Sequence, residues 1–253
     1  MSENLKTIVN YLDEYLEIGK IKDYCPNGLQ VEGRAEILKV LGGVTASQAL
    51  IDEAVRQGVD AVLVHHGFFW KGERAEITGI KRNRLKALLE NDISLLAYHL
   101  PLDVHPEVGN NIQLAKKLNI SITGPLEPLA SKSIGLVGEL PEAISASDFQ
   151  DFVGRVLNRQ CMHVGDGKQI IRKVAWCTGA AQSMIDKAVD LGVDAFLSGE
   201  ISEPTVHTAR ETGVHYFSAG HHATERYGVQ ALGHKLEAEF DIQFQFIDID
   251  NPV

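Results

Sequence analysis

Two adjacent histidines end an apolar run in the stretch DAVLVHHGFFW, residues 60–70. Imidazole nitrogens bind transition metals and transfer protons near neutral pH, so His65 and His66 are candidates for either chemistry. Neighbouring side chains of a regular strand point to opposite faces. At a strand end followed by the permissive backbone of Gly67, however, the two rings can splay into one pocket, where each can serve one ion of a two-metal centre.

A histidine and a carboxylate stand four residues apart at two further places, His99 with Asp103 in HLPLD and His221 with Glu225 in HHATE. The second pair is predicted to enter a helix, where positions i and i+4 share a face and can converge on one ion. The prolines of HLPLDVHPE forbid a regular helix around the first pair. We therefore expect Asp103, rather than His99, to be a ligand.

Apolar strands alternate with amphipathic helices along the chain, which predicts an α/β fold whose helices cover the faces of its sheets. Helices that each follow a strand are expected at 46–57, 80–90, 107–118, 181–191, 203–212 and 223–240. Another helix is expected over 145–157, where Ser145 and Asp148 occupy capping-box positions. The alternating stretch 241–250 predicts a half-exposed or edge strand.

An internal repeat divides the chain. QALIDEAVRQGVDAVL at 48–63 aligns with QSMIDKAVDLGVDAFL at 182–197, with ten identities in sixteen positions, where ordinary composition gives about one. We infer two duplicated α/β halves, 1–125 and 126–253, with the C-terminal helix and strand packing on the first half. A cleft between related halves is a favoured place for a site.

The repeat also aligns the candidate site residues. It places His65 and His66 over Gly199 and Glu200 and, after a length difference, His99 and Asp103 over His221 and Glu225. Both halves thus carry ligands or acid–base groups at strand ends, where α/β proteins place their sites. A single histidine there is more often structural, so the prediction of a metal site depends on these positions together.

Composition argues against several classes of protein. The formal charge of -10 argues against sequence-independent binding to nucleic-acid phosphates. The basic residues Lys81, Arg82 and Arg84 are expected to form the solvated face of a helix. Three cysteines without C-x-x-C spacing indicate neither a disulfide framework nor a structural zinc site. We find no signal peptide and no run of the ~20 apolar residues that a membrane span needs, and expect a cytoplasmic protein.

Motifs along nearly the whole chain are similar to those of one known family. They are CPNGLQVEGRAEILKVLGGVTAS, VLVHHGFFWKG, YHLPLDVHPEVGNN, GELPE, CTGAAQSMIDKAVDLGVDAFLSGE and AGHHATERYGV. In order and spacing they resemble the Nif-three-like family of dinuclear metal proteins, whose bacterial members are also called GTP cyclohydrolase I type 2 homologues. The chain is most similar to the short bacterial type, which lacks the extra central domain of some relatives.

The resemblance implies two intertwined α/β halves, a two-metal site in the cleft between them and a homohexameric ring with the metal sites facing its interior. Matching the family's motifs gives five metal ligands, His65, His66, Asp103, His221 and Glu225. Glu200 in SGE also matches, and we expect it to orient a ligand or to act as a general base. Histidine and carboxylate ligands suit two divalent ions of Zn, Fe, Mn, Co or Ni.

Two functions stay open at this point. One is a hydrolase in which metal-activated water attacks a small molecule, such as a nucleotide or another purine derivative. The other is a non-catalytic ring that its ions stabilise and that binds a protein or nucleic-acid partner, with nucleic acid disfavoured on the acidic exterior. The aromatic run Phe68, Phe69 and Trp70 is expected to pack at a subunit contact rather than to stack on a substrate.

Overall fold

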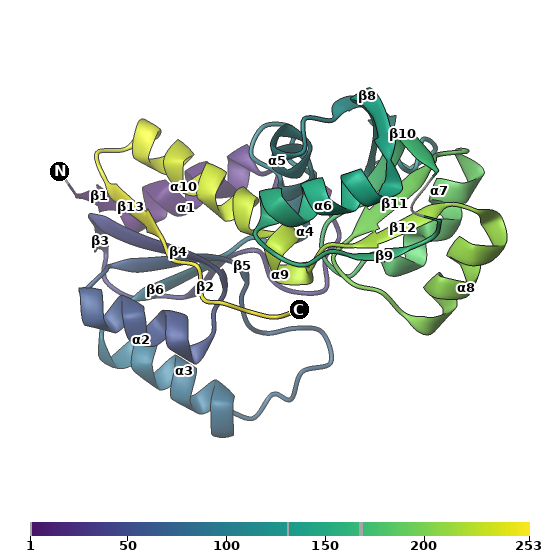
Figure 1. Cartoon of the computed structure of the whole chain (residues 1–253). Helices are drawn as coiled ribbons and strands as arrows, with labels where there is room; N and C mark the ends of the chain where they lie inside the picture. Colours follow the sequence, from purple (N-terminus) through teal and green to yellow (C-terminus); the bar gives the residue numbers. More distant parts are fainter. Residues whose placement is uncertain (1, 131, 167–168) are drawn as a thin grey trace. The chain divides into compact units, whose positions relative to one another are not determined.

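The computed structural model describes residues 2–130, 132–166 and 169–253. They form two compact units, shown in Figure 1: unit 1 comprises 1–108 and 228–250, and unit 2 comprises 109–227 and 251–253. The division expected after residue 125 lies inside unit 2, because strand Ser121–Pro125 pairs with Leu136–Ser145. Across the described ranges, no helix combines the length and apolar character needed to cross a membrane.

Unit 1 is built on a five-stranded sheet in the order β13-β4-β5-β6-β2. The first four of these strands are parallel, and β2 is antiparallel to β6; β1 and β3 form a separate two-stranded sheet. Its elements are β1 (Glu3–Asn4), α1 (Leu5–Tyr15), the 3-10 helix η1 (Ile18–Lys20), β2 (Gly28–Val31), β3 (Glu36–Ile37), β4 (Lys39–Thr45), α2 (Gln48–Gln57), β5 (Ala61–His66), α3 (Gly79–Glu90), β6 (Ser94–Ala97), α4 (Leu100–Val104), all but the start of α10 (Arg226–Glu239) and β13 (Gln243–Phe246).

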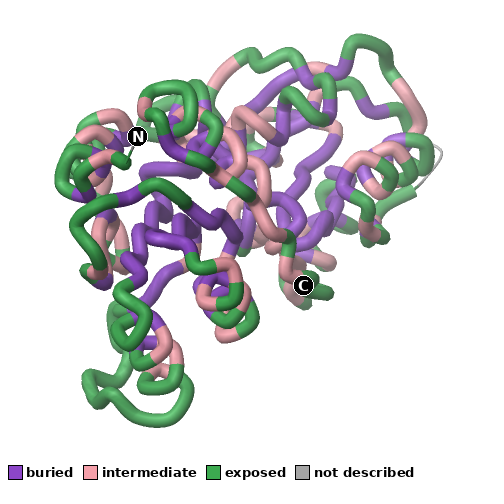
Figure 2. Tube along the Cα trace, turned by 90° about the vertical axis from the view of Figure 1, so that its left-hand side faces the viewer, coloured by how far each residue is buried: buried purple, intermediate pink, exposed green. Residues whose placement is uncertain are grey.

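The two faces of this sheet bury alternate residues of β5. Ala61 and Leu63 pack in the cluster that contains the apolar residues of α1 and α10. Val62 and Val64 pack in the cluster formed with α2 and α3. Figure 1 shows these helix pairs on opposite faces, and Figure 2 colours the buried parts of the chain purple. β13 is the edge strand that the alternating stretch predicts, with alternate residues exposed.

Unit 2 is built on a six-stranded sheet in the order β7-β8-β10-β11-β12-β9. Its central strands β10, β11 and β12 are parallel, and antiparallel strands complete both edges. Its elements are α5 (Asn110–Lys117), β7 (Ser121–Pro125), β8 (Leu136–Ser145), α6 (Ala146–Leu157), β9 (Met162–Val164), β10 (Ile170–Cys177), the 3-10 helix η2 (Gln182–Met184), α7 (Ile185–Asp190), β11 (Ala195–Ser198), α8 (Glu203–Thr212), β12 (His215–Ser218) and α9 (His221–Thr224).

Helices cover both faces of the unit 2 sheet as well. One face packs with α5 and α6 around the fully buried Trp176, and the other packs with α7 and α8. The capping prediction for α6 is confirmed, because Ser145 Oγ accepts from the backbone N–H of Asp148 at 3.1 Å. The structure therefore confirms the α/β fold, with helices on both faces of each sheet, that the sequence pattern predicts.

The internal repeat corresponds to α2 with β5 in unit 1 and to α7 with β11 in unit 2. Gly58 and Gly192, which align, adopt left-handed backbone with φ of +60° and +59° just past their helices, a conformation that favours glycine. The helix starts differ because Ser47 caps α2 with its hydroxyl, whereas Ala181 at the aligned position has no such group. The second copy accordingly begins as a 3-10 turn and gives a shorter helix.

Candidate metal centre

His65 and His66 are the last two residues of β5, yet their ring centroids lie only 4.6 Å apart. His65 Nδ1 lies 2.9 Å from the carbonyl oxygen of Tyr98, and His66 Nδ1 lies 3.1 Å from Thr45 Oγ1. A hydrogen bond between Nδ1 and an oxygen atom fixes the orientation of an imidazole ring and leaves Nε2 available to bind a metal ion. The pair can therefore present two Nε2 atoms to one region.

Gly67 supports this arrangement for a different reason from the one expected. Its φ is not in the left-handed region, but a Cβ there would lie 2.2 Å from Gln30 Oε1 and 2.6 Å from the Cβ of Ala97. Gln30 in turn exchanges two hydrogen bonds with the backbone of Phe68, at 2.7 and 3.1 Å. The glycine is needed because a neighbouring side chain packs directly against it.

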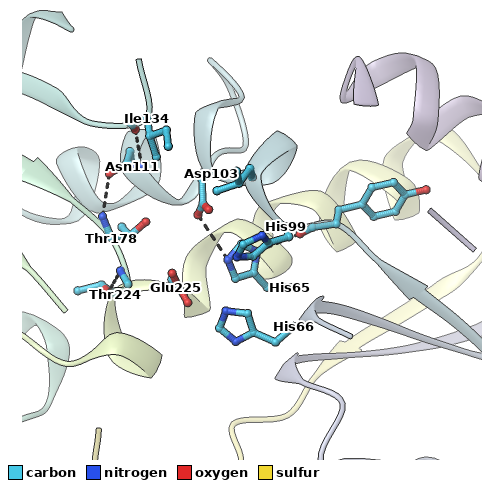
Figure 3. A network of polar contacts seen from close by, with 12 residues as sticks. His65, His66, His99, Asp103, Asn111, Ile134, Thr178, Thr224 and Glu225 are labelled. Carbon is cyan, nitrogen blue, oxygen red and sulfur yellow. Dashed lines mark hydrogen bonds and ion pairs between the residues drawn. The ribbon is translucent and has the colours of Figure 1, made fainter. Parts of the chain in front are cut away.

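Asp103 lies on α4 and points toward His65, as Figure 3 shows. Its Oδ1 is 3.5 Å from His65 Nε2, and the aspartate is only 4% exposed. The expectation that prolines forbid a regular helix here is wrong. Pro101 falls in the first turn of α4, where the N–H that proline lacks has no helical acceptor, so a five-residue helix forms.

His99 precedes α4, and its ring contacts the carboxylate of Asp23. Its Nδ1 lies 2.9 Å from Asp23 Oδ1, and both side chains are buried. Burial of Asp23 would raise the pKa of its carboxyl, but hydrogen bonds from His99 and Asn27 outweigh burial and lower that pKa to about 2. A ring nitrogen of His99 also lies within 4.8 Å of ring nitrogens of His65 and His66. The repeat alignment contained no signal for Asp23.

In unit 2, His221 and Glu225 span the short helix α9. His221 Nε2 is 3.1 Å from Glu225 Oε2, and His221 Nδ1 is 2.7 Å from Glu200 Oε1. Burial alone would lower the pKa of His221, but the hydrogen bonds to Glu225 and Glu200 outweigh it and raise that pKa to about 9. The predicted i, i+4 contact forms, and Glu200 touches the other nitrogen of the same ring.

Two residues that the sequence did not single out hold α9 in place. Thr224 Oγ1 accepts from the backbone N–H of Gly179 at 3.1 Å, a contact marked at Thr224 in Figure 3. The hydroxyl also lies 2.9 Å from the carbonyl oxygens of Gly220 and His221 at the start of α9, to which it can donate. Gly179 has φ +68°, and a Cβ there would lie 2.1 Å from Glu225 Oε1. The glycine of the CTG motif therefore makes room for the Glu225 carboxylate.

The Gly179 loop is fixed from the other side by the buried Asn111. Its Oδ1 accepts from the N–H of Thr178 at 3.1 Å, and its Nδ2 donates to the carbonyl of Ile134 at 3.0 Å (Figure 3). The carbonyl of Asn111 accepts from the indole of Trp176. An asparagine in GNN carries no recognisable spacing signal, so only the structure identifies this support.

Two histidines for which the sequence offered no partner are buried and hydrogen-bonded. His105 Nε2 lies 3.1 Å from the carbonyl of Tyr15. His215 Nδ1 lies 2.9 Å from Nε2 of His163 in unit 2. Burial and the neighbouring Asp23 carboxylate raise the pKa of the Cys25 thiol to about 12.

Each unit thus supplies nitrogen and oxygen donors of the kinds that divalent transition metals prefer. Unit 1 groups His65, His66 and His99, with Asp103 beside His65, and unit 2 pairs His221 with Glu225. Buried carboxylates are costly unless a cation or several donors compensate their charge. The donor chemistry therefore fits a metal ion at either set.

The comparisons with known proteins agree on one family. The model of Duf34/NIF3 (NGG1p interacting factor 3) matches residues 3–252. The GTP cyclohydrolase 1 type 2 homolog of Pseudomonas aeruginosa is 57% identical over 252 residues, covering 100% of both chains. The protein of the same name from Escherichia coli K12 is 53% identical over 242 residues, covering 95% of this chain and 96% of that protein.

Solved structures agree with this grouping. Protein ybgI, described as of unknown function, is 51% identical with a TM-score of 0.95 over 99% of this chain and 100% of that chain. Reduced HcgD from Methanocaldococcus jannaschii is 26% identical with a TM-score of 0.83 over 98% of this chain and 99% of that chain. With its mixed α/β fold on two main sheets and its histidine and carboxylate donors, the chain belongs to the Duf34/NIF3 family.

Proposed function

We propose that this protein is a metal-dependent hydrolase that binds two divalent ions per subunit and acts on a small molecule. The observation that carries the proposal is the buried pair of His65 Nε2 and Asp103 Oδ1, which lie 3.5 Å apart. This separation exceeds an ordinary hydrogen bond. Bonds of about 2.0–2.2 Å at tetrahedral angles place two ligands of one ion about 3.4 Å apart, so the pair is spaced for a shared cation.

The proposed ligands are the five that the family resemblance implies, namely His65, His66 and Asp103 of unit 1 and His221 and Glu225 of unit 2. The repeat supports this assignment, because it aligns Asp103 with Glu225 at equivalent strand ends. Structural zinc sites are closed by four protein ligands, whereas catalytic ions keep an open position. Five protein ligands shared by two ions leave such positions open, which favours catalysis over a purely structural centre.

Divalent ions in this centre would lower the pKa of bound water toward 7 and polarise the group under attack. The chain's own contribution is to hold the donors, and Glu200 would do so for His221 through their 2.7 Å contact. Glu200 is thus proposed as a positioning residue. Relatives that carry the name GTP cyclohydrolase 1 type 2 homolog direct the substrate search toward nucleotides and other purine derivatives.

The assembly proposed for this function is a homohexameric ring, as the family resemblance implies. Exposed apolar side chains on and before α3, Ile77, Ile80 and Leu89, supply surface of the kind that subunit contacts bury. Light scattering coupled to size-exclusion chromatography tests the assembly against the 27.7 kDa mass of one chain. A monomer across the concentration range would contradict it.

The function is tested by measuring bound metals in the purified protein and screening nucleotides, phosphoesters and amides for turnover. Wild type is compared with His65→Ala, Glu225→Ala and the exposed control His234→Ala. We expect both site variants to lose metal and turnover while the control keeps both. Metal binding without turnover on any substrate, together with a retained macromolecular partner, would instead identify a non-catalytic ring.

A further inference from the structure

Asp23 and His99 are not among the five proposed ligands. Asp23 holds the His99 ring in one orientation, as a carboxylate does for a histidine that binds a metal ion. Each carboxylate oxygen of Asp23 accepts two hydrogen bonds. Its Oδ1 accepts from His99 Nδ1 at 2.9 Å and from the N–H of Tyr24 at 2.7 Å. Its Oδ2 accepts from the N–H of Leu100 at 2.9 Å and from Asn27 Nδ2 at 3.0 Å. Four donors converging on one buried carboxylate stabilise its ionised form.

An ionised Asp23 determines which nitrogen of His99 carries the proton. A carboxylate only accepts hydrogen bonds, so Nδ1 of His99 must be an N–H, and in the neutral imidazole the lone pair is then on Nε2. The backbone beside the ring is fixed as well, because the N–H of His99 donates to Asn27 Oδ1 at 2.7 Å. The result is an imidazole with one tautomer and one orientation, which is how proteins prepare a metal ligand.

Aromatic neighbours restrict the ring further. Trp70 meets it edge-on with centroids 5.0 Å apart, and Tyr24 does so at 5.3 Å. The aromatic run after the histidine pair thus places Trp70 against His99, and Trp70 itself is fixed by the 3.2 Å bond from its Nε1 to the carbonyl of Gly67. These contacts hold His99 without using the nitrogen that faces away from Asp23.

His65, His66 and His99 share one pattern. Each has Nδ1 next to an oxygen, from the Tyr98 carbonyl, the Thr45 hydroxyl and the Asp23 carboxylate respectively. A ring nitrogen of each lies within 4.8 Å of the others, and the His99 ring centroid is 5.0 Å from that of His65 and 5.7 Å from that of His66. Three imidazoles anchored in the same way converge within unit 1.

We propose that His99 is a third metal-binding imidazole of this centre, held by Asp23 with Nε2 toward the ion. The inference rests on the proposed metal site and adds to it one ligand and one positioning residue. A site built instead from Asp23, Cys25 and His99, whose donor atoms also approach one another, is disfavoured because it would take Asp23 from four hydrogen-bond donors.

The variant Asp23→Asn separates this proposal from a merely structural pair. Two fixed donors, from Leu100 and Asn27, face the Oδ2 position, whereas only one, the N–H of Tyr24, faces Oδ1 beside the His99 ring. We therefore expect the asparagine to place its oxygen at Oδ2 and its NH₂ group toward His99, with loss of the Tyr24 hydrogen bond. His99 Nδ1 then becomes the acceptor and Nε2 carries the proton, which blocks metal binding while shape is retained. A purely structural pair would tolerate this exchange far better than a ligand.

The experiment titrates metal-free full-length protein with Co²⁺ and Cu²⁺ and compares His99→Gln and Asp23→Asn with wild type. His105→Gln is the matched control, since it removes another buried histidine of unit 1 that is bonded to backbone. We expect His99→Gln and Asp23→Asn to weaken metal affinity about 10–100-fold, and His105→Gln to leave it unchanged. Electron spin-echo modulation of bound Cu²⁺ should show one imidazole fewer in His99→Gln.

Circular dichroism and thermal unfolding of the metal-free variants establish that each one is folded. Wild-type affinity and an unchanged imidazole count in both His99→Gln and Asp23→Asn would overturn the proposal. If His65→Ala loses metal in the same series, that failure concerns His99 alone and the proposed function stands. If His65→Ala also binds metal like wild type, the metal centre itself is misplaced.

Discussion

Glu200 and Glu225 hold opposite nitrogens of one imidazole. Glu200 Oε1 lies 2.7 Å from His221 Nδ1, and Glu225 Oε2 lies 3.1 Å from His221 Nε2. A metal that binds Nε2 would replace the second contact and leave the first in place. Glu200 therefore has the position of the carboxylate that orients a ligand histidine and increases its basicity.

Replacing Glu200 with Gln should keep the shape of this contact and remove its charge. The amide oxygen can still accept from His221 Nδ1, so we expect metal content to persist while turnover falls about 10–100-fold. Metal analysis and initial rates on the best substrate of the screen measure the two effects. Glu203→Gln, an exposed change on α8, is the control. Unchanged turnover in Glu200→Gln would exclude a role for its charge.

Gly179→Ala should disturb the Glu225 carboxylate directly. The added Cβ would lie 2.1 Å from Glu225 Oε1 and 3.2 Å from His221 Nε2, at a residue with φ +68°. We expect loss of bound metal together with backbone strain of about 1–2 kcal/mol. Metal analysis and urea unfolding of the metal-free protein measure the two parts separately.

Gly192→Ala is the matched control for that change. Gly192 has φ +59°, but a Cβ there meets nothing within 4 Å. It should therefore show the backbone strain without the loss of metal. Equal metal content in the two alanine variants would mean that Glu225 moves aside at no cost, and would weaken its assignment as a ligand.

The repeat allowed much of this structure to be predicted from sequence. Periodicity located the strands and helices, and the aligned copies marked the strand ends that carry His65, His66 and Glu200. The His221–Glu225 contact also followed, because i, i+4 spacing on one helical turn is a local property. Local rules succeed where the interacting residues are close along the chain.

The partners that orient these residues could not be predicted in the same way. Asp23 lies 76 residues before His99, and the Tyr98 carbonyl that anchors His65 is a backbone atom with no side-chain signature. Pro101 was misread because its effect depends on its position within a helix, which the sequence pattern left open. Long-range anchors of this kind become visible only once the sheet brings strand ends together.

The repeated aspartates Asp60 and Asp194 should stabilise their units in the same way. Asp60 Oδ2 accepts from the N–H groups of Leu38 and Lys39, and Asp194 Oδ2 accepts from those of Arg172 and Lys173, all at 2.7–2.9 Å. Alanine at either position leaves two backbone donors without this acceptor. We expect each change to lower the free energy of unfolding by about 1–3 kcal/mol in urea titrations.

The control for these changes comes from the same repeat. Asp52 is exposed on α2, where its carboxylate accepts from Gln48. Replacing Asp52 with Ala should change the free energy of unfolding by no more than about 0.5 kcal/mol. If Asp60→Ala and Asp194→Ala prove as mild as Asp52→Ala, the repeat preserves these aspartates for some reason other than the backbone contacts.

The histidine pair of unit 2 should make the fold sensitive to acid. Gln169 Oε1 accepts from His215 Nε2 at 2.8 Å, so His215 Nδ1 must accept from His163 Nε2 at 2.9 Å. Burial lowers the pKa of both rings, and each ring also lies near Asp166, which opposes that shift. A further proton on His215 would set two N–H donors against each other.

The sign of the pH effect follows from these lowered pKa values. In the unfolded chain both rings titrate near 6.5, so below that pH the unfolded state binds more protons than the folded state. The contribution of this histidine pair to the free energy of unfolding is therefore complete above pH 6.5. It is lost as the pH falls through the lowered pKa values of the folded state.

We expect the urea midpoint of metal-free protein to decrease between pH 7.5 and 5.5. The double variant His163→Gln and His215→Gln should flatten that decrease, whereas the exposed control His234→Gln should not. A decrease of wild-type size in the double variant would assign the acid sensitivity to other groups.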